Sequence, residues 1–370
     1  MHQKNIKRID IDARFYGPIG KGLGRYTQEI VDNIIKLDLE NQYVIFLRPE
    51  NFSEFKTDNP LVKKVLVNIK WYGLAEQVLF PYYIWREHLN LMHFPHFNVP
   101  LFCPVKFIVT IHDLILIKYP TARATTLGPL YYKIKNLAYK LVISRAVRRA
   151  KKVLAVSEFT KKDIVNHFKI KPEKVMVTYE GISSFPPDKG GLRGVNSPYL
   201  LYVGNAYPHK NLEGLIRVFA GISRTLPDLK LVLVGKDDYF YSRLKQYAKD
   251  FSDKIIFPGY VPDAELAELY ADALAYVFPS FYEGFGLPPL EAMAHGLPVA
   301  SSNQTCLPEI LGDAALYFNP DDEAEMKNKI ERIITDENLR EQLRNRGYEQ
   351  IKKYSWQECA GKTLEIYKKV

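Results

Sequence analysis

The chain has 370 residues, of which 47% are hydrophobic and 25% charged, a composition typical of globular proteins. This length exceeds what one hydrophobic core usually accommodates, so the sequence predicts two domains. No apolar run approaches a membrane span, and the first residues lack the apolar core of a signal peptide, so we expect a cytoplasmic protein. The three cysteines, Cys103, Cys306 and Cys359, are isolated and indicate neither a disulfide framework nor a zinc site.

The net charge of +9 is unevenly distributed along the chain. Residues 1–185 carry 29 Lys and Arg against 16 Asp and Glu, whereas residues 186–370 carry 22 against 26. The densest cationic segment, residues 130–152, has eight cations, no anion and interleaved Leu, Ile and Tyr. It suits a helix lying on an anionic membrane surface, and equally a solvated helix face over an apolar stripe. No nucleic-acid recognition motif accompanies it, so we expect no nucleic-acid partner.

Short β-branched runs alternate with longer amphipathic segments in both halves of the chain. This alternation predicts an α/β protein with two parallel sheets covered by helices. The predicted strands of the first half are Ile9–Ala13, Tyr43–Leu47, Val65–Ile69, Phe107–Ile111, Val153–Val156 and Val175–Val177. Those of the second half are Leu200–Val203, Leu229–Val234, Lys254–Phe257, Ala273–Phe278 and Pro298–Ala300. The segment 183–198, rich in Pro, Gly and Ser, is the predicted linker.

The loops after the strands are the candidate sites, because ligands of open parallel sheets bind beyond the carboxyl ends of strands. After the first predicted strand, Gly20, Gly22 and Gly24 precede a helix predicted to begin near Arg25, and they permit close approach of a ligand to the backbone. Their spacing differs from the dinucleotide-binding fingerprint, which disfavours a nicotinamide dehydrogenase.

His112 follows another predicted strand, Phe107–Ile111. At that place it would point toward a cleft between the domains and could hydrogen-bond a polar substrate. A hydrogen-bonded core histidine is the ordinary alternative. Its position after a strand end favours the functional interpretation.

A second polar loop, GNAYPHKNLEGL, begins at Gly204 and Asn205 and includes Lys210 just before a helix predicted near Asn211. An ammonium beside the free amides of a helix start suits a diphosphate. A surface lysine is the alternative, and Lys210 alone does not decide between them.

Two glutamates flank the turn in the stretch YEGFGLPPLEAMAHGLPV, which begins at Tyr282. Glu283 lies just past the predicted strand Ala273–Phe278, and Glu291 lies in a short helix predicted over Pro288–His295. The free amides at the start of that helix are a natural place for an anion. A further loop supplies the amides of Thr305, Cys306 and Leu307 before Pro308.

Together these segments resemble the retaining glycosyltransferases of family 4. The resemblance covers nearly the whole chain and rests on KGLGRYTQEI, TIHDL, VSEFTKKDI, YVGNAYPHKNL, FPGYVPDAEL, YEGFGLPPLEAMA and LPEILGDAALYF in the order of the family. It implies the GT-B fold, two Rossmann-like domains with facing parallel sheets and an inter-domain cleft. Residues 1–185 would bind the acceptor and 186–354 the nucleotide-sugar donor. Residues 355–370, anchored by Trp356, would form a helix that crosses back to the first domain.

The resemblance also implies roles for individual residues in the donor site. Glu291 matches the glutamate that holds the ribose hydroxyls, and Glu283 the one that contacts the donor sugar. Lys210 matches the lysine that binds the diphosphate, and His112 the histidine beside the transferred sugar. The resemblance also assigns backbone contacts with the donor to Gly22, Gly24, Tyr260, Val261, Gly286 and Leu287. The loops at the strand ends add Gly204, Asn205, Thr305 and Cys306 to the predicted donor-binding residues.

One position departs from the family pattern. Many members have an arginine where this chain has Asn205, so half of the usual cationic clamp is missing, and Arg14 or Arg25 is a candidate substitute. The resemblance implies a metal-independent transfer with retention of configuration. No Asp-x-Asp pair lies in a predicted donor loop, because Asp10 and Asp12 belong to the first predicted strand.

The nearest alternatives are a glycosidase and a catalytically inactive binding or scaffold protein. Paired carboxylates also serve glycosidases, but a hydrolase has no use for a phosphate site made by a lysine and helix amides. A scaffold would be expected to have lost His112, Lys210, Glu283 or Glu291, and all four are present. The general resemblance to bacterial mannosyl and rhamnosyl transferases of surface polysaccharide assembly favours GDP-mannose, with UDP- and dTDP-sugars left open. The acceptor would be a glycan or lipid-linked, and a peripheral location on the inner membrane face is consistent with it.

Overall fold

The computed structural model describes residues 6–120, 129–182, 197–251 and 253–370. They form two compact units. Of the described residues, the first contains 6–117, 129–181 and 355–370, and the second contains 118–120, 182, 197–251 and 253–354. Most of the predicted linker, residues 183–196, lies outside the described residues.

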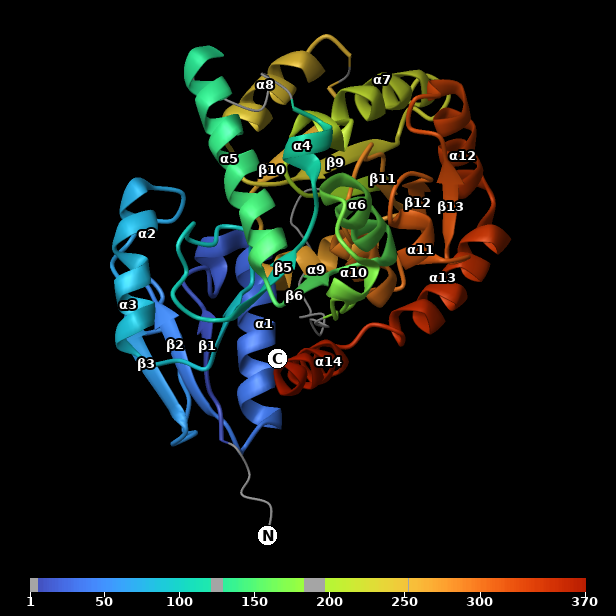
Figure 1. Ribbon diagram of the computed structural model, residues 1–370. Helices are drawn as coiled ribbons and strands as arrows, with labels where there is room; N and C mark the ends of the chain where they lie inside the picture. Colours follow the sequence, from blue (N-terminus) through green and yellow to red (C-terminus); the bar gives the residue numbers. More distant parts are fainter. Residues whose placement is uncertain (1–5, 121–128, 183–196, 252) are drawn as a thin grey trace. The chain divides into compact units, whose positions relative to one another are not determined.

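The first unit is built on a sheet of parallel strands in the order β3-β2-β1-β4-β5-β6-β7 (Figure 1). The strands are β1 (Arg8–Asp12), β2 (Gln42–Leu47), β3 (Val62–Leu66), β4 (Leu91–Phe94), β5 (Phe107–Ile111), β6 (Lys152–Ala155) and β7 (Val175–Val177). The chain order reverses between β1 and β4, so this is an open, doubly wound sheet with its switch point there.

The second unit repeats this design with the order β10-β9-β8-β11-β12-β13, again parallel throughout. Its strands are β8 (Tyr199–Val203), β9 (Lys230–Val234), β10 (Ile255–Gly259), β11 (Ala275–Phe278), β12 (Val299–Ser302) and β13 (Ala315–Phe318). The switch point lies between β8 and β11. The predicted α/β class with two parallel sheets is therefore confirmed.

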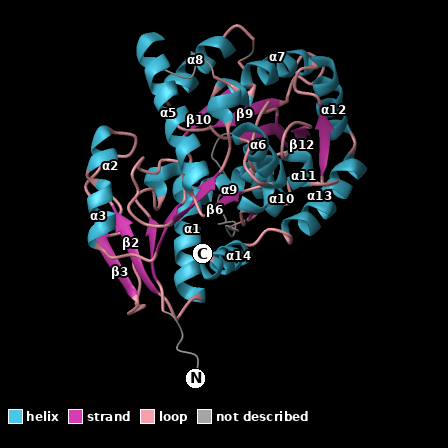
Figure 2. Ribbon diagram, viewed as in Figure 1, coloured by secondary structure: helices cyan, strands magenta, loops and turns pink. Residues whose placement is uncertain are grey.

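Helices connect the strands in both units (Figure 2). From the N-terminus to the end of β7 they are α1 (Lys21–Leu37), α2 (Leu74–Val78), α3 (Phe80–Arg86), α4 (Ile115–Lys118), α5 (Pro129–Arg149) and α6 (Glu158–Phe168). After β8 they are α7 (Leu212–Ile222), α8 (Tyr239–Ala248), α9 (Asp263–Asp272), α10 (Leu287–Ala294), α11 (Leu307–Leu311), α12 (Glu323–Thr335), α13 (Glu337–Ile351) and α14 (Trp356–Lys369). The 3-10 turns η1 (Pro18–Gly20), η3 (Pro172–Lys174) and η4 (Pro208–Lys210) complete them.

The third strand was predicted three residues too late in the sequence. It was predicted at Val65–Ile69, but β3 spans Val62–Leu66 and includes Lys63 and Lys64. Because β3 lies at the edge of the sheet and pairs only with β2, it tolerates lysines that a central strand would exclude. The strands β4 and β13 were not predicted.

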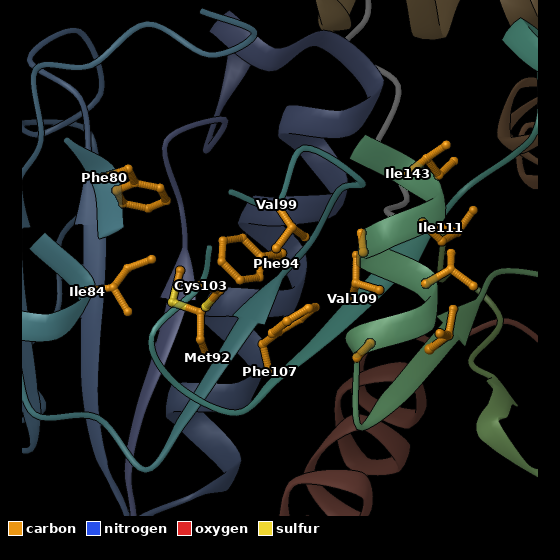
Figure 3. Packing of buried hydrophobic residues seen from close by; sticks show 14 of the residues in the cluster. Phe80, Ile84, Met92, Phe94, Val99, Cys103, Phe107, Val109, Ile111 and Ile143 are labelled. Atoms are coloured by element: carbon orange, nitrogen blue, oxygen red, sulfur yellow. The ribbon is translucent and has the colours of Figure 1, made fainter. Parts of the chain in front are cut away.

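Apolar side chains cover both faces of the first sheet. One cluster joins β2, β4, β5 and β6 to α3, α5 and α6, and Figure 3 shows part of it, including Phe80, Phe94, Phe107 and Ile143. The other cluster joins the opposite face to α1 and α14. Each fully buried large apolar side chain contributes about 1.5–3 kcal/mol, so both helix layers are firmly attached to the sheet.

The last helix, α14, packs on the first unit beside α1 (Figure 1). The Trp356 side chain is 6% exposed, and its ring lies 5.9 Å from that of Tyr26 on α1. The Ser355 hydroxyl accepts from the Glu358 amide at 3.4 Å and caps the helix start. Gly181 makes the close approach possible, because a Cβ atom there would lie 2.1 Å from the Trp356 backbone nitrogen.

We therefore expect Gly181→Ala to loosen the attachment of α14 and to destabilise the first unit by about 2–3 kcal/mol, as overpacking against backbone does. Gly361→Ala on α14 is the matched control, because a Cβ atom there would have no neighbouring atom within 4 Å. That variant should gain up to about 1 kcal/mol of helix propensity. Urea unfolding followed by tryptophan fluorescence measures both, and equal midpoints for the two variants would contradict the packing account.

Candidate active site

The loop after β8 places Lys210 at the carboxyl end of the second sheet. It runs through η4 into Asn211, which adopts a left-handed conformation with φ of 55° at the start of α7. The Asn211 side chain donates to the carbonyl of Pro320 at 3.0 Å and so fixes the end of this loop. The amide of Phe281 donates to the carbonyl of His209 at 2.8 Å, which ties the loop after β11 to the loop after β8.

Lys210 and Glu283 form an ion pair between these two loops. The Lys210 ammonium lies 2.5 Å from Glu283 Oε1, and the two side chains are only 12% and 9% exposed. The ammonium also lies 5.5 Å from the centre of the Phe278 ring. Because β8 and β11 flank the switch point, the two predicted residues are brought together where ligands of such sheets bind.

Thr305 supports Glu283 from a third loop, the one after β12. Its hydroxyl accepts a hydrogen bond from the Glu283 amide at 3.1 Å. Thr305 has a φ of 58°, a conformation that is rare for a β-branched residue and that concentrates at functional sites. Cys306 is buried and donates its thiol to the carbonyl of Phe285 at 3.2 Å. Burial raises the pKa of this thiol, so Cys306 is a packing residue at the site and not a nucleophile.

The helix α10 begins immediately after Gly286, which has a φ of 95°. The following residues Pro288 and Pro289 have no amide hydrogen, so the amides of Gly286 and Leu287 are the donors at this helix start. The predicted helix differed by one residue at each end. Both amides therefore lie at the start of α10, and their contact with a ligand stays a prediction.

Glu291 lies on α10 and is partly exposed. Its Oε2 accepts a hydrogen bond from Tyr270 of α9 at 3.4 Å. The Tyr270 ring is buried and stacks on His295 with 5.2 Å between centres. These contacts restrict the Glu291 side chain without enclosing it. Tyr270 was not among the predicted site residues.

The other predicted residues of the second unit lie at the same edge of the sheet. Gly204 follows β8, and its carbonyl accepts from the Tyr241 hydroxyl at 2.9 Å. The Asn205 carbonyl accepts from Tyr202 at 2.8 Å. Tyr260 and Val261 follow β10, where the tyrosine is 74% exposed and the valine is buried.

In the first unit, the predicted start of the glycine-rich helix was late. The helix α1 begins at Lys21, so Gly22 and Gly24 lie in its first turn. Gly24 is required by packing, because a Cβ atom there would lie 2.0 Å from the carbonyl oxygen of Gly17. Gly22 is different, since a Cβ atom there would have no heavy atom within 4 Å. The fold itself therefore gives no reason for glycine at position 22.

Arg14 does not replace the arginine missing at Asn205. Its side chain is fully buried, with Nε and one terminal nitrogen each 2.7 Å from the Asp12 carboxylate. The same terminal nitrogen lies 2.6 Å from Glu76 Oε1. Two carboxylates neutralise this guanidinium inside the first unit, so its charge is not available to a ligand. Arg25, half-buried on α1, is the remaining candidate.

His112 follows β5 directly, with both ring nitrogens bonded to protein acceptors. Nδ1 lies 3.0 Å from Glu180 Oε1, and Nε2 lies 2.9 Å from the carbonyl oxygen of Pro95. The Tyr26 ring meets the imidazole edge-on at 4.5 Å. Glu180 was not predicted, although a carboxylate three residues beyond the buried strand β7 was a signal that could have identified it.

The geometry brings the predicted residues together in two groups, one in each unit. In the second unit Glu283 contacts both Lys210 and Thr305, and His112 lies in the first unit. Within the described ranges, no three His, Cys, Asp or Glu side chains converge as ligands of a metal ion.

Comparison with known proteins identifies the family. The family described as "Glycosyltransferase Family 4" matches residues 20–184, and "Glycosyl transferases group 1" matches residues 188–350. The O-antigen chain mannosyltransferase B of Escherichia coli is 32% identical over 94% of this chain and 96% of its own length. The chain belongs to the family 4 glycosyltransferases. The O-antigen chain mannosyltransferase RfbU of Salmonella typhimurium is 34% identical over 70% of this chain and 71% of its own.

Solved structures support the fold of this glycosyltransferase. The sucrose-phosphate synthase of Thermosynechococcus elongatus superposes with a TM-score of 0.75 at 20% identity and covers 98% of both chains. WaaG, a glycosyltransferase involved in lipopolysaccharide biosynthesis, gives a TM-score of 0.72 at 15% identity, with 97% of this chain and 99% of that one covered. The two Rossmann-like units therefore constitute a GT-B fold.

The buried pair of this glycosyltransferase makes a stability prediction. Lys210→Met or Glu283→Gln alone should destabilise the second unit by about 3 kcal/mol, because each leaves a partly buried charge without its partner. The double variant should recover much of the loss. Lys352→Met is the control, since its pair with Glu349 is exposed and is expected to contribute less than about 1 kcal/mol. Urea unfolding of the four variants measures this, and strictly additive losses would contradict a direct interaction.

Proposed function

We propose that this glycosyltransferase transfers mannose from GDP-mannose to a glycan or lipid-linked acceptor in the assembly of a surface polysaccharide. The observation that carries the proposal is the Lys210–Glu283 pair, which sets a cation and a carboxylate at the switch point of the second sheet. The choice of mannose is supported by the relatives, two of which are O-antigen mannosyltransferases. In this proposal the second unit binds the donor and the first unit binds the acceptor.

Charge recognition explains how the donor would be held. The Lys210 ammonium is neutralised by Glu283. A diphosphate carries more charge than one carboxylate, so it would compete for this ammonium and draw it away from Glu283. Glu283 would then be released toward the donor sugar. The amides of Gly286 and Leu287 add donors without any charge of their own.

The chemical step is the departure of the nucleoside diphosphate from the anomeric carbon. The bond between that carbon and the phosphate oxygen breaks, and a bond to the acceptor hydroxyl oxygen forms on the same face, which retains the configuration. The hydroxyl proton passes to the leaving phosphate oxygen. Negative charge builds on that oxygen, so Lys210 and the helix amides stabilise the transition state more than the bound donor. This route requires no metal ion.

Substitutions of Glu283 and Glu291 should affect different kinetic parameters. Glu291→Ala should mainly raise the KM for the donor, by about 10- to 100-fold, because it removes charge-assisted hydrogen bonds to the ribose. Glu283→Ala should mainly lower kcat, by about 100-fold. Initial-rate kinetics decide, with Glu265→Ala on the exposed face of α9 as the control. Unchanged kinetics in both variants would sink the assignment.

Gly22 provides a test in the first unit. We expect Gly22→Ala to fold with unchanged or slightly higher stability, since space exists for the methyl group in α1. It should raise the donor KM about tenfold, or about 1.4 kcal/mol, because the methyl group obstructs the diphosphate. Gly24→Ala should instead lower the melting temperature. Wild-type KM in Gly22→Ala would show that no ligand approaches this backbone.

The function itself is tested by a nucleotide panel. A ligand that binds only the native state raises the melting temperature, so GDP, UDP, dTDP and ADP can be ranked by thermal shift. We expect GDP to give the largest shift and GDP-mannose to be consumed with an extracted acceptor lipid. A larger shift with another nucleotide would change the donor. No shift with any of them would favour the inactive scaffold.

The helix α5 supports a membrane-bound acceptor. Ile134, Leu137 and Leu141 are 61%, 70% and 57% exposed and recur at the spacing of one helix face. Lys133, Lys135 and Lys140 beside them are exposed as well. Among the described helices, none is long and apolar enough to cross a membrane. An apolar stripe flanked by cations fits docking on an anionic leaflet, with each engaged lysine contributing about 1 kcal/mol.

Liposome co-sedimentation tests this docking. Binding should require anionic lipid and should weaken as the salt concentration rises. Lys140→Glu should reduce binding severalfold, whereas Lys249→Glu on the second unit should not. Equal binding to neutral and anionic liposomes, or none to either, would leave α5 as a solvated helix face.

A further inference from the structure

We propose that Glu180 is a positioning residue for the transfer reaction, which holds His112 as an imidazolium in a fixed orientation at the end of β5. This role rests on the proposed function, because it concerns the same reaction. It goes beyond the residues so far assigned, since Glu180 is contributed by a different strand end.

Hydrogen-bond geometry carries the proposal. The partner of Nδ1 is the Glu180 carboxylate at 3.0 Å, and the partner of Nε2 is the Pro95 carbonyl at 2.9 Å. A carbonyl oxygen and an ionised carboxylate both accept hydrogen bonds and donate none. A neutral imidazole has one N–H and can satisfy only one of these acceptors. The arrangement is therefore complete when both ring nitrogens carry hydrogens.

The backbone around Glu180 is rigid. Two residues earlier, the Thr178 amide donates to the carbonyl of Ala155 at 2.9 Å, which continues the pairing of β7 with β6. One residue later, Gly181 lies against Trp356 of α14. Glu180 itself is only 5% exposed. Its carboxylate is thus held at one place, and the imidazole with it.

The surrounding charges favour a cation on His112. Burial, the largest single effect, lowers the pKa of His112, but the hydrogen bond and charge of Glu180, together with Pro95 and Asp113, outweigh it. The resulting pKa lies above the ordinary histidine value. The titratable groups that face this ring from the packed elements are Tyr26, His93, His96, Asp113 and Glu180.

The two neighbouring histidines stay neutral. Burial, with the His112 charge as the second cause, lowers the pKa of His93 to about 3 and that of His96 well below its usual range. His93 is also bonded to the hydroxyls of Tyr367 and Thr110 at 2.7 and 2.9 Å. The positive charge of this group of histidines is therefore concentrated on His112.

In the proposed function His112 lies beside the transferred sugar. One carboxylate neutralises one imidazolium, so the pair adds no net charge, and Glu180 acts by keeping the ring protonated and in one orientation. Because Glu180 raises the His112 pKa, the imidazolium persists to higher pH than that of an ordinary histidine and is lost as the pH rises through the raised pKa. Without the Glu180 charge, the same loss would occur at lower pH.

The test is the pH dependence of kcat for wild type and Glu180→Gln. The substitution keeps the size of the side chain and removes its charge. We expect the basic limb to move to lower pH by about one unit, so that activity falls about tenfold at pH values above the wild-type limb and recovers toward wild type below the limb of the variant. Glu180→Asp should retain the position of the limb. Glu173 is exposed and lies two residues before the start of β7. Glu173→Gln is therefore the matched control and should leave the pH dependence of kcat unchanged.

A second readout follows the proton directly. The ¹⁵N resonances of His112 should titrate above the ordinary histidine range in wild type and at lower pH in Glu180→Gln. His112→Asn should abolish the basic limb of the kcat profile. This variant keeps the proposal testable if Glu180→Gln fails to fold. If wild type transfers sugar but the limb survives in His112→Asn, or stays in place in Glu180→Gln, the positioning role is overturned while the proposed function stands. If wild type transfers sugar from none of the donors, the proposed function fails, and the role of Glu180 falls with it.

Discussion

The ion pair between Lys210 and Glu283 is the interaction on which the candidate donor site depends. It joins two loops that are 73 residues apart in sequence but that leave neighbouring strands. Both charges are largely buried, and a buried charge is tolerated only with a partner. The pair therefore keeps each residue in place for the other until a ligand of higher charge arrives. In the proposed function, Glu283 holds the Lys210 ammonium until the donor diphosphate replaces the carboxylate as its partner.

The topology of the second sheet makes this pairing possible. β8 and β11 are adjacent and parallel, and the chain leaves them in opposite directions to cover the two faces. Their loops therefore separate above the sheet and leave backbone amides accessible at the start of α10. A third loop contributes Thr305, which has a left-handed conformation and whose hydroxyl accepts a hydrogen bond from the Glu283 amide. Backbone strain at that residue is consistent with a site that is held in one geometry.

Local patterns were sufficient to predict the fold class and most strands. β5 and β7 agree with their predicted bounds because both are apolar and continuous. β3 was misplaced since an edge strand admits Lys63 and Lys64, and β4 and β13 were not predicted. Lys210 and Glu283 could be selected from the sequence, but their contact could not, because it depends on which strands become neighbours. For the same reason the partner of His112 remained hidden in TYEGI, and the burial of Arg14 between Asp12 and Glu76 was not foreseen.

Calorimetric binding of nucleoside diphosphate and monophosphate tests the central claim most directly. If Lys210 exchanges Glu283 for the donor diphosphate, wild type should prefer GDP over GMP, and Lys210→Met should lose most of that preference. Glu283→Gln should keep the preference and bind GDP more tightly, since no carboxylate competes for the ammonium. A GDP preference that is unchanged in Lys210→Met, or weaker GDP binding in Glu283→Gln, would contradict the account.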